Sequence, residues 1–312
     1  MRALAVAVTL SLCLMNVTYA AGAVDAKAGA VGAKDMKAVL VTGASTGIGR
    51  KVTERLAADG YFVYAGARKD SDLHALAALK NVQAVRLDVT SPEQIEAARK
   101  SIEQAGRGLY GLVNNAGVVT IATVMDTSMQ EFDTVMAVNV YGPWRITRAF
   151  APLVIAAHGR ITNIGSVNGI VTSAQASAYC MSKHAIEAFT DALAQEMAPL
   201  GVQVNVVDPG GYKSEIFNSA VQRSGTGKEA AQRAAARPEA DDVALTVEQA
   251  LFEAHPKRRY LVVPSEQQAR HTIAAQLHTL VELNERQRYT YDRAALIKML
   301  DEALTQSTAA AH

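Results

Sequence analysis

The stretch Ala38-Val-Leu-Val-Thr-Gly-Ala-Ser-Thr-Gly-Ile-Gly49 contains the features that decide the fold of this chain. A short apolar run ends in a glycine-rich turn, and residues 48–58 then follow a helical period. Further apolar runs lie at residues 61–65 and 82–87, with a helical segment between them. Continuous Val, Ile and Leu strands that alternate with helices indicate a parallel sheet covered on both faces.

The same alternation continues to about residue 265, with further strands expected at residues 109–113, 159–165 and 202–207. A long helix is expected from about residue 127 to 157, with Pro143 and Pro152 tolerated as kinks. The sequence therefore predicts an α/β fold, a doubly wound parallel sheet of the Rossmann type, in a single domain.

The N-terminus has the three parts of a secretory leader: a basic start, an apolar run at residues 3–15, and small residues at Thr18 and Ala20. We predict a signal peptide at residues 1–23 and a flexible tether at residues 24–36, which places the protein in the periplasm or outside the cell. The alternative is a true start at Met36, which would make the protein cytoplasmic. The domain itself is expected at residues 37–305, and it includes a C-terminal helical extension.

The formal net charge of +1 gives no reason to propose a nucleic-acid partner. Cys13 lies in the predicted leader, and Cys180 then has no other cysteine to pair with, so no disulfide framework is expected. The predicted mature chain contains no membrane span, and the prediction includes no metal.

The glycine-rich turn has the spacing G-x-x-x-G-x-G between the first strand and the first helix. Glycines at this junction permit a tight turn and let backbone N–H groups approach a pyrophosphate, while the helix N-terminus supplies partial positive charge. The turn therefore predicts a dinucleotide site.

Tyr179 and Lys183 are four positions apart in a helix-forming run, so their side chains should lie on one helix face. We expect the ammonium of Lys183 to lower the pKa of the phenol, because an opposite charge nearby favours the charged form. Ser166 follows a predicted buried strand, and we expect it to face Tyr179 across a cleft.

These features, together with others in the same order along residues 37 to about 265, resemble the short-chain dehydrogenases/reductases. The matching segments are Thr42-Gly-Ala-Ser-Thr-Gly-Ile-Gly49, Asp88-Val89, Asn114-Asn-Ala-Gly117, Asn139, Ser166, the pair Tyr179 and Lys183, and Pro209-Gly210.

The resemblance implies an NAD(P)-dependent oxidoreductase acting on alcohols, with a catalytic set of Asn139, Ser166, Tyr179 and Lys183. Ser166 and Tyr179 would bind the substrate oxygen, and Tyr179 would donate or accept the proton. Lys183 would also bind the nicotinamide ribose, and Asn139 would anchor a water. The implied cofactor-binding residues are Gly43, Ser45, Thr46, Gly47, Ile48, Gly49, Arg68, Asp88, Val89, Asn115, Ala116, Gly117, Tyr179, Lys183, Pro209 and Gly210.

The second strand ends at Ala67 with no carboxylate, and Arg68 and Lys69 follow. An acidic residue at this point binds the ribose 2′-OH of NAD, whereas an arginine accommodates a 2′-phosphate. We therefore predict NADP(H) rather than NAD(H). The alternative is that Arg68 and Lys69 are solvated surface charges.

Residues 212–240 show little regular period and are expected to form a mobile substrate lid. The predicted pocket is mostly apolar, which favours a hydrophobic alcohol or a ketone or aldehyde as substrate. Its apolar residues would be Val118, Val119, Val167, Ile170 and Phe217.

Two other functions remain open. One is a cofactor-binding regulatory protein without turnover, against which the intact catalytic set argues. The other is an epimerase or dehydratase of nucleotide sugars, whose glycine spacing usually differs. The family resemblance also implies a homodimer or homotetramer.

Overall fold

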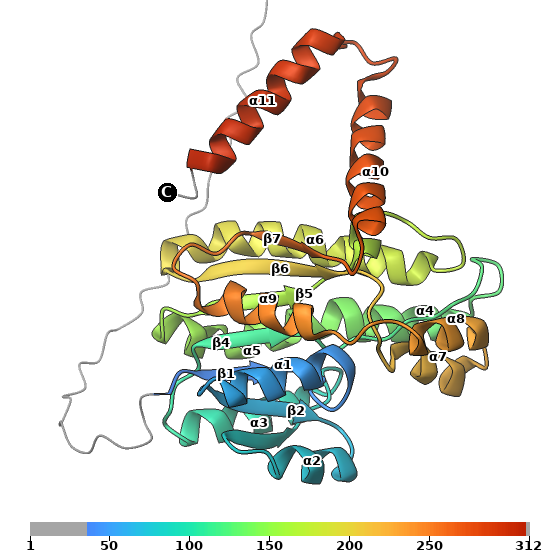
Figure 1. Cartoon of the computed structure of the whole chain (residues 1–312). Coiled ribbons are helices and arrows are strands. Elements are labelled where there is room, and N and C mark those ends of the chain that lie inside the picture. The colour runs from blue at the N-terminus through green and yellow to red at the C-terminus, as the bar shows by residue number, and fades with distance from the viewer. Residues whose placement is uncertain (1–35, 310–312) are drawn as a thin grey trace, which may run out of the picture. The chain divides into compact units, whose positions relative to one another are not determined.

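The computed structural model describes residues 36–309, so the predicted signal peptide and tether lie outside the described residues. Seven strands form one sheet in the order β3-β2-β1-β4-β5-β6-β7 (Figure 1). Every neighbouring pair is parallel. This confirms the predicted doubly wound α/β fold. The strands are β1 Ala38–Val41, β2 Phe62–Ala67, β3 Val82–Arg86, β4 Gly111–Asn114, β5 Arg160–Ile164, β6 Gln203–Pro209 and β7 Arg259–Val262.

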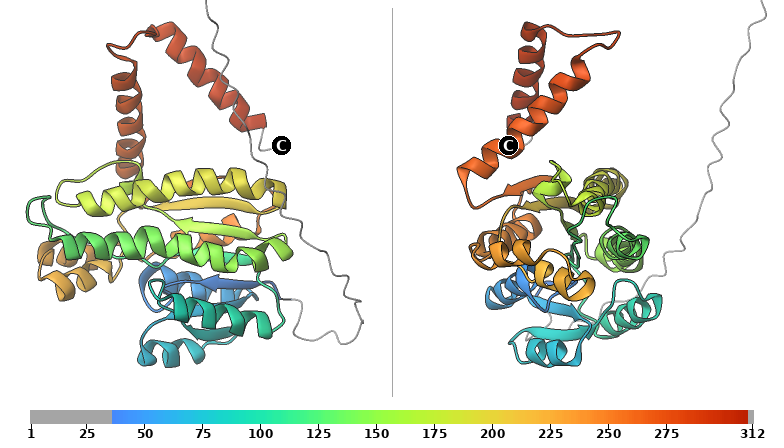
Figure 2. Two further views of the ribbon diagram at one scale, coloured as in Figure 1. Left: turned by 180° about the vertical axis from the view of Figure 1, so that it is seen from behind. Right: turned by 90° about the vertical axis from the view of Figure 1, so that its right-hand side faces the viewer.

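Helices cover both faces of the sheet, as Figure 2 shows from behind and from the side. Buried side chains of α1 (Gly47–Ala58), α2 (Asp70–Ala77) and α9 (Asp241–Phe252) form one apolar core with β1 and β2. Side chains of α3 (Pro92–Gln104), α5 (Gly142–Ala156) and α6 (Ser177–Met197) form a second core on the opposite face. Burial of two faces explains why the strands are continuously apolar.

The long helix around Pro143 is confirmed, and it changes its hydrogen bonding where the site begins. After α4 (Met129–Met136) the chain passes through a π-helical segment, η1 (Ala137–Tyr141), and continues as α5. Pro143 has no N–H and cannot donate to the carbonyl of Asn139, four residues earlier. A π-helical turn is a frequent feature of functional sites, and here it contains Asn139.

The expectation of an irregular segment at residues 212–240 is only partly met. Two short helices, α7 (Ile216–Ser224) and α8 (Lys228–Ala235), form most of it. The following helix, α9, was not predicted, although Val243, Val247 and Leu251 give it an apolar face in the core. Alanines and acidic residues between its apolar positions weaken the helical pattern in the sequence, which explains why α9 was not predicted.

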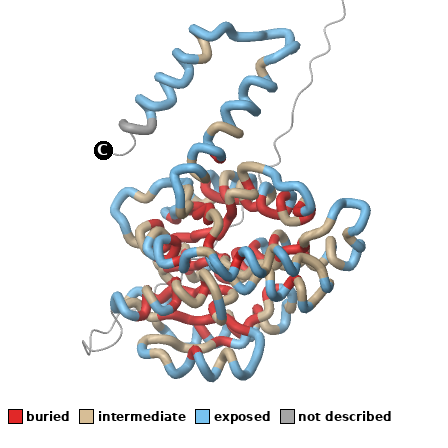
Figure 3. The backbone as a smooth tube through the Cα atoms, turned by 45° about the vertical axis from the view of Figure 1, so that its right-hand side comes forward, coloured by how far each residue is buried: buried red, intermediate tan, exposed pale blue. Residues whose placement is uncertain are grey.

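The predicted C-terminal helices are present as α10 (Glu266–Asn284) and α11 (Arg293–Ala309). Both are mostly exposed (Figure 3). The first turns of α10 contact the sheet domain, because Gln268 Oε1 accepts a hydrogen bond from the backbone N–H of Gly211 at 3.0 Å and Thr272 is buried. Among residues 36–309, no helix combines the length and apolar character needed to cross a bilayer.

Candidate active site

A cleft of about 1080 Å³ lies beside the carboxyl ends of the strands. Loops after β1, β4, β5 and β6 line it, and α7, α8 and α10 contribute from the other side. It exceeds the roughly 300–1,000 Å³ of a typical small-ligand pocket, so a dinucleotide and a substrate fit together. Of the predicted site residues, Gly47 and Asn139 alone do not line this cleft.

The glycine-rich turn forms a close-fitting cradle. Gly43 and Gly47 adopt positive φ values of 64° and 53°. A side chain on Gly49 would place its Cβ 2.3 Å from both Asn115 Nδ2 and the Gly43 carbonyl oxygen. At the start of α1, the side chain of Thr46 does not cap the helix. Exposed backbone donors at a helix N-terminus fit a pyrophosphate, so these residues suit a dinucleotide.

Thr42 joins this cradle to the loop after β4. Its hydroxyl accepts hydrogen bonds from the backbone N–H groups of Asn115 and Ala116 at 3.0 and 3.1 Å. The side chain of Asn115 in turn donates to the carbonyls of Thr42 and Gly43 at 2.9 and 3.0 Å. The two motifs that the sequence predicted separately are therefore one hydrogen-bonded unit.

Arg68 and Asp88, both expected to bind the cofactor, lie together in the cleft. Arg68 Nη1 is 3.8 Å from Asp88 Oδ2, and the Arg68 side chain is 64% exposed. Asp88 Oδ1 also accepts hydrogen bonds from the backbone N–H and hydroxyl of Thr90 at 2.8 and 2.6 Å. A bound 2′-phosphate would therefore compete with Asp88 for Arg68.

Tyr179 and Lys183 lie on the same face of α6, as predicted, and both line the cleft. The Lys183 ammonium is 5.7 Å from the centre of the Tyr179 ring and donates a 2.8 Å hydrogen bond to the carbonyl of Ile164. Burial lowers the pKa of Lys183 to about 8, although the charges of Asp208 and Glu187 oppose this shift.

The net shift of the Tyr179 pKa is opposite to the predicted lowering. Burial raises the pKa of Tyr179 to about 12, and a hydrogen bond with the side chain of Ser166 opposes the shift only in part. The predicted approach of Ser166 and Tyr179 across the cleft is thus met. The effect of burial on this pKa could not be predicted from the sequence, because it depends on the elements that surround the ring. A phenol in this environment stays protonated at neutral pH.

Asn139 is 1% exposed, and its side chain forms hydrogen bonds with other residues of the domain. Its Oδ1 accepts from the backbone N–H of Val118 at 2.8 Å, and its Nδ2 donates to the Val118 carbonyl and the Ser182 hydroxyl, both at 2.9 Å. Ser182 follows Tyr179 by three residues, so Asn139 connects the loop after β4 to α6. Its side-chain donors are used in these contacts, so the water predicted at Asn139 would have to meet other atoms of the residue.

Sequence reasoning missed a buried acidic pair beneath Ser166. Asp208 Oδ1 accepts a hydrogen bond from the backbone N–H of Ser166 at 3.0 Å, and the side chain is 1% exposed. Burial, together with the neighbouring Glu187, raises the pKa of Asp208 to about 9. Arg259 Nε donates to Glu187 Oε2 at 2.8 Å from the outer side. An acidic residue directly before Pro209 at the end of a buried strand was the signal in the sequence.

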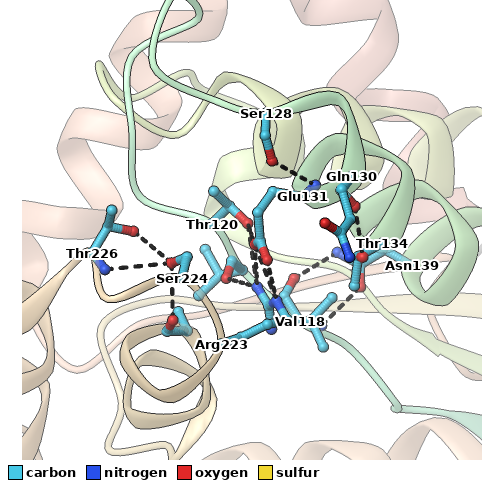
Figure 4. A network of polar contacts seen from close by, with 12 residues as sticks. Val118, Thr120, Ser128, Gln130, Glu131, Thr134, Asn139, Arg223, Ser224 and Thr226 are labelled. Atoms are coloured by element: carbon cyan, nitrogen blue, oxygen red, sulfur yellow. Dashed lines mark hydrogen bonds and ion pairs between the residues drawn. The ribbon is translucent and has the colours of Figure 1, made fainter.

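A second missed group connects α7, which belongs to the predicted lid, to the rest of the domain (Figure 4). Arg223 on α7 donates through Nε to both carboxylate oxygens of Glu131 at 3.0 Å. Its Nη2 donates to the Val119 carbonyl at 2.8 Å and to the Thr120 hydroxyl at 3.2 Å. The two charged side chains are 24% and 15% exposed. We call this group the lid latch.

The apolar residues predicted for the pocket are mostly in place. Val118, Val119, Val167 and Phe217 line the cleft, whereas Ile170 does not. The Ile170 carbonyl accepts a hydrogen bond from Gln276 of α10. Among residues 36–309, no cluster of three or more His, Cys, Asp or Glu side chains is arranged to bind a metal.

Comparison with known proteins gives consistent matches. The family model described as short chain dehydrogenase matches residues 37–225. D-beta-hydroxybutyrate dehydrogenase of Bos taurus mitochondria is 41% identical over 186 residues, covering 56% of this chain and 54% of that protein. Retinol dehydrogenase 5 of Mus musculus is 38% identical over 186 residues, covering 58% of each chain. The chain spans about half the length of these curated relatives.

Solved structures share the fold along most of the chain. A short chain dehydrogenase/reductase from Burkholderia phymatum in complex with NAD has a TM-score of 0.70 at 25% identity, covering 84% of this chain and 99% of that one. A serine dehydrogenase in complex with NADP+ has a TM-score of 0.66 at 26% identity, covering 72% and 94%. The similar structures thus include both cofactors.

Proposed function

Because the chain belongs to the short chain dehydrogenase family, we propose that it is an NAD(P)-dependent oxidoreductase that interconverts a secondary alcohol with a ketone, or an alcohol with an aldehyde. The observation that carries this proposal is the convergence of Ser166, Tyr179 and Lys183 on one cleft that also contains the glycine cradle. The bovine and murine relatives are named as dehydrogenases of hydroxybutyrate and retinol, both of which are alcohols.

Each catalytic side chain has a task that its surroundings support. A bound nicotinamide supplies the hydride for reduction or accepts it in oxidation. The Ser166 hydroxyl and the Tyr179 phenol hold the carbonyl oxygen, and the protonated phenol donates its proton as the alkoxide forms. The Lys183 ammonium stabilises the phenolate that remains, and Asn139 holds α6 and the loop after β4 in register.

We propose NADP(H) as the preferred cofactor, on the basis of Arg68 at the end of β2. Its exposed guanidinium is able to form a bidentate ion pair with a 2′-phosphate. Asp88 lies on the other side of this arginine and would favour NAD(H) if it kept the ion pair. Comparing kcat/KM for NADPH and NADH in wild type and Arg68→Ala tests this: we expect the preference for NADPH to disappear in the variant.

The substrate is proposed to have an apolar body. Val118, Val119, Val167 and Phe217 supply the apolar wall of the cleft. A panel of ketones and aldehydes of increasing chain length, assayed by NADPH oxidation, should show kcat/KM rising with length until the pocket is filled.

The decisive test compares wild type with Tyr179→Phe. We expect the variant to lose about 10²- to 10⁴-fold in kcat, because general acid–base catalysis contributes that much, while its dissociation constant for the dinucleotide changes little. Equal rates in the two proteins, or binding without turnover in wild type, would instead indicate a cofactor-binding regulatory protein.

The leader and the location of the protein are part of the proposal. We propose that residues 1–23 direct export to the periplasm or the medium and are removed. N-terminal sequencing of the protein from its native host tests this, because a first residue at Met36 would indicate a cytoplasmic protein that starts there.

A further inference from the structure

Arg237 is a cation in the cleft without an acidic partner. It lies between α8 and α9, lines the cleft and is half-buried. Its guanidinium lies 5.3 Å from the centre of the Phe217 ring, a cation–π contact that restricts its orientation. No carboxylate within residues 36–309 forms an ion pair with it. The nearby Glu215, which also lines the cleft, accepts instead from Asn218 Nδ2 at 2.7 Å.

Gln268 on α10 supplies a second donor at the same place. Its Oε1 accepts from the backbone N–H of Gly211, which fixes the amide group so that Nε2 is the free end. The Nε2 atom has no hydrogen-bond partner in the part of the chain that the structure describes. A Cβ built on Gly211 would lie 3.1 Å from Gln268 Nε2 and 3.6 Å from Arg237 Nε, so both donors meet beside this glycine.

We propose that Arg237 and Gln268 bind an anionic group of the substrate, most simply a carboxylate, so that the preferred substrate is a hydroxy acid or oxo acid with an apolar chain. The inference rests on the proposed function and names the substrate class of the same cleft. A guanidinium and an amide N–H₂ side by side match the two oxygens of a carboxylate.

The proposed anion site lies in the same cleft as the proposed catalytic residues. Gly211 directly follows Pro209-Gly210, the turn that is expected beside the nicotinamide, and Ser166 and Tyr179 line the same cleft. A substrate whose anionic group is bound there has the rest of its chain in the cleft that Ser166 and Tyr179 line. The first turns of α10 therefore have a role in recognition, although this helix lies beyond residues 37–225, where the family model matches.

The test compares an acid with its own neutral ester, so that the reacting alcohol group is the same and only the negative charge differs. The substrates are 3-hydroxybutanoate and 3-hydroxyoctanoate, each beside its methyl ester, and kcat/KM is measured with saturating cofactor. We expect wild type to prefer each acid over its ester by about 10- to 100-fold, the range for a hydrogen bond to a charged group. In Arg237→Met the acid should lose this preference, while the rate with the ester stays the same.

Two further variants separate a binding role from a structural one. Gln268→Glu keeps the acceptor oxygen for Gly211 and replaces Nε2 by a carboxylate oxygen, so the acid should be rejected and the ester retained. Lys228→Met removes a charge from an exposed side chain at the start of α8 that does not line the cleft, and should change neither rate.

The cofactor phosphates are the other anion that Arg237 is able to meet, and binding measurements distinguish the two. The dissociation constant of the reduced cofactor, from its fluorescence, should be unchanged in Arg237→Met. A large increase would overturn the proposal and assign Arg237 to the cofactor. Absence of an acid preference in wild type, with the esters still oxidised, would overturn it too and leave the proposed function intact. Failure of every alcohol would count against the proposed function itself.

Discussion

Asp208 Oδ1 accepts a hydrogen bond from the backbone N–H of Ser166 at 3.0 Å, from a position with almost no solvent access. The interaction fixes the backbone at Ser166, at the start of the loop after β5. Gly165 makes room for it, since a Cβ there would lie 2.0 Å from Asp208 Oδ1 and 2.8 Å from Glu187 Oε1. Two carboxyl groups in so small a space cannot both be charged at low cost, so the pair retains a proton.

The replacement Asp208→Asn should flatten the pH dependence of stability. The folded-state pKa of Asp208 is raised to about 9, whereas an unfolded aspartate titrates near 4. The native state therefore holds a proton that the unfolded chain releases, and the free energy of unfolding falls as pH rises through this window. Urea unfolding across that range should show a shallower fall in the variant than in wild type. Equal slopes would contradict the argument, and Asp301→Asn on exposed α11 is the control.

The pH dependence of catalysis should differ for the two directions of the reaction. The pKa of Tyr179 is raised to about 12, so the phenol is ready to donate a proton, and oxidation, which needs the phenolate, should speed up as pH rises. Reduction should slow where Lys183 loses its charge, near its pKa of about 8. In Lys183→Arg, which stays charged, this decline should be absent from the profile of kcat/KM against pH. A decline that persists at the same pH would assign it to another group.

The replacement Gly49→Ala should weaken dinucleotide binding. The added Cβ would meet Asn115 Nδ2 and the Gly43 carbonyl at 2.3 Å, and overpacking of this kind costs about 1–3 kcal/mol. Both contacted groups belong to the cradle, so the substitution should lower the affinity for the cofactor as well as the free energy of unfolding. Gly106→Ala is the matched control, because its φ is 66° but no atom lies within 4 Å. That variant should lose stability alone, with an unchanged dissociation constant for the cofactor.

Breaking the lid latch should raise KM more than it lowers kcat. In Arg223→Met the carboxylate of Glu131 loses its cationic partner in a partly buried site and keeps only the Thr120 hydroxyl, and α7 is released from the loop after β4. Limited proteolysis should then cut within residues 214–240 faster than in wild type. The exposed pair Arg233 and Glu229 on α8 provides the comparison, because exposed pairs contribute only about 0–1 kcal/mol. Similar protease sensitivity of Arg223→Met and Arg233→Met would contradict a role for the latch.

The expected homodimer or homotetramer predicts an effect of Trp144→Glu. Trp144 and Tyr141, on the helix of Asn139, and Met181, on α6, are each 54% exposed. Apolar side chains this exposed on two helices are candidates for the subunit contact of the expected oligomer, and a charge buried there would be costly. Light scattering should show a smaller particle for this variant. Leu280→Glu on α10, also at an exposed apolar position, should leave the mass unchanged.

Local patterns in the sequence determined the parallel sheet, the glycine cradle and the placement of Tyr179 and Lys183 on one helix face, because each depends on short-range spacing. A turn, a strand end or an i, i+4 pair on a helix places its residues without knowledge of the rest of the chain. The order of motifs then placed Ser166 and Tyr179 in one cleft. The boundaries of α7, α8 and α9 were not predicted, since their apolar residues are diluted by alanine and by charged side chains.

Only the tertiary structure decided the pKa values in the site and the contacts between its distant segments. The pKa of Tyr179 depends on burial by distant elements, and a spacing rule that considered Lys183 alone gave the wrong direction. The contact of Asp208 with Ser166, and the meeting of Arg237 with Gln268 beside Gly211, join segments that are far apart in the sequence. Burial and convergence are properties of the packed chain, whereas periodicity and turn chemistry are already present in its linear order.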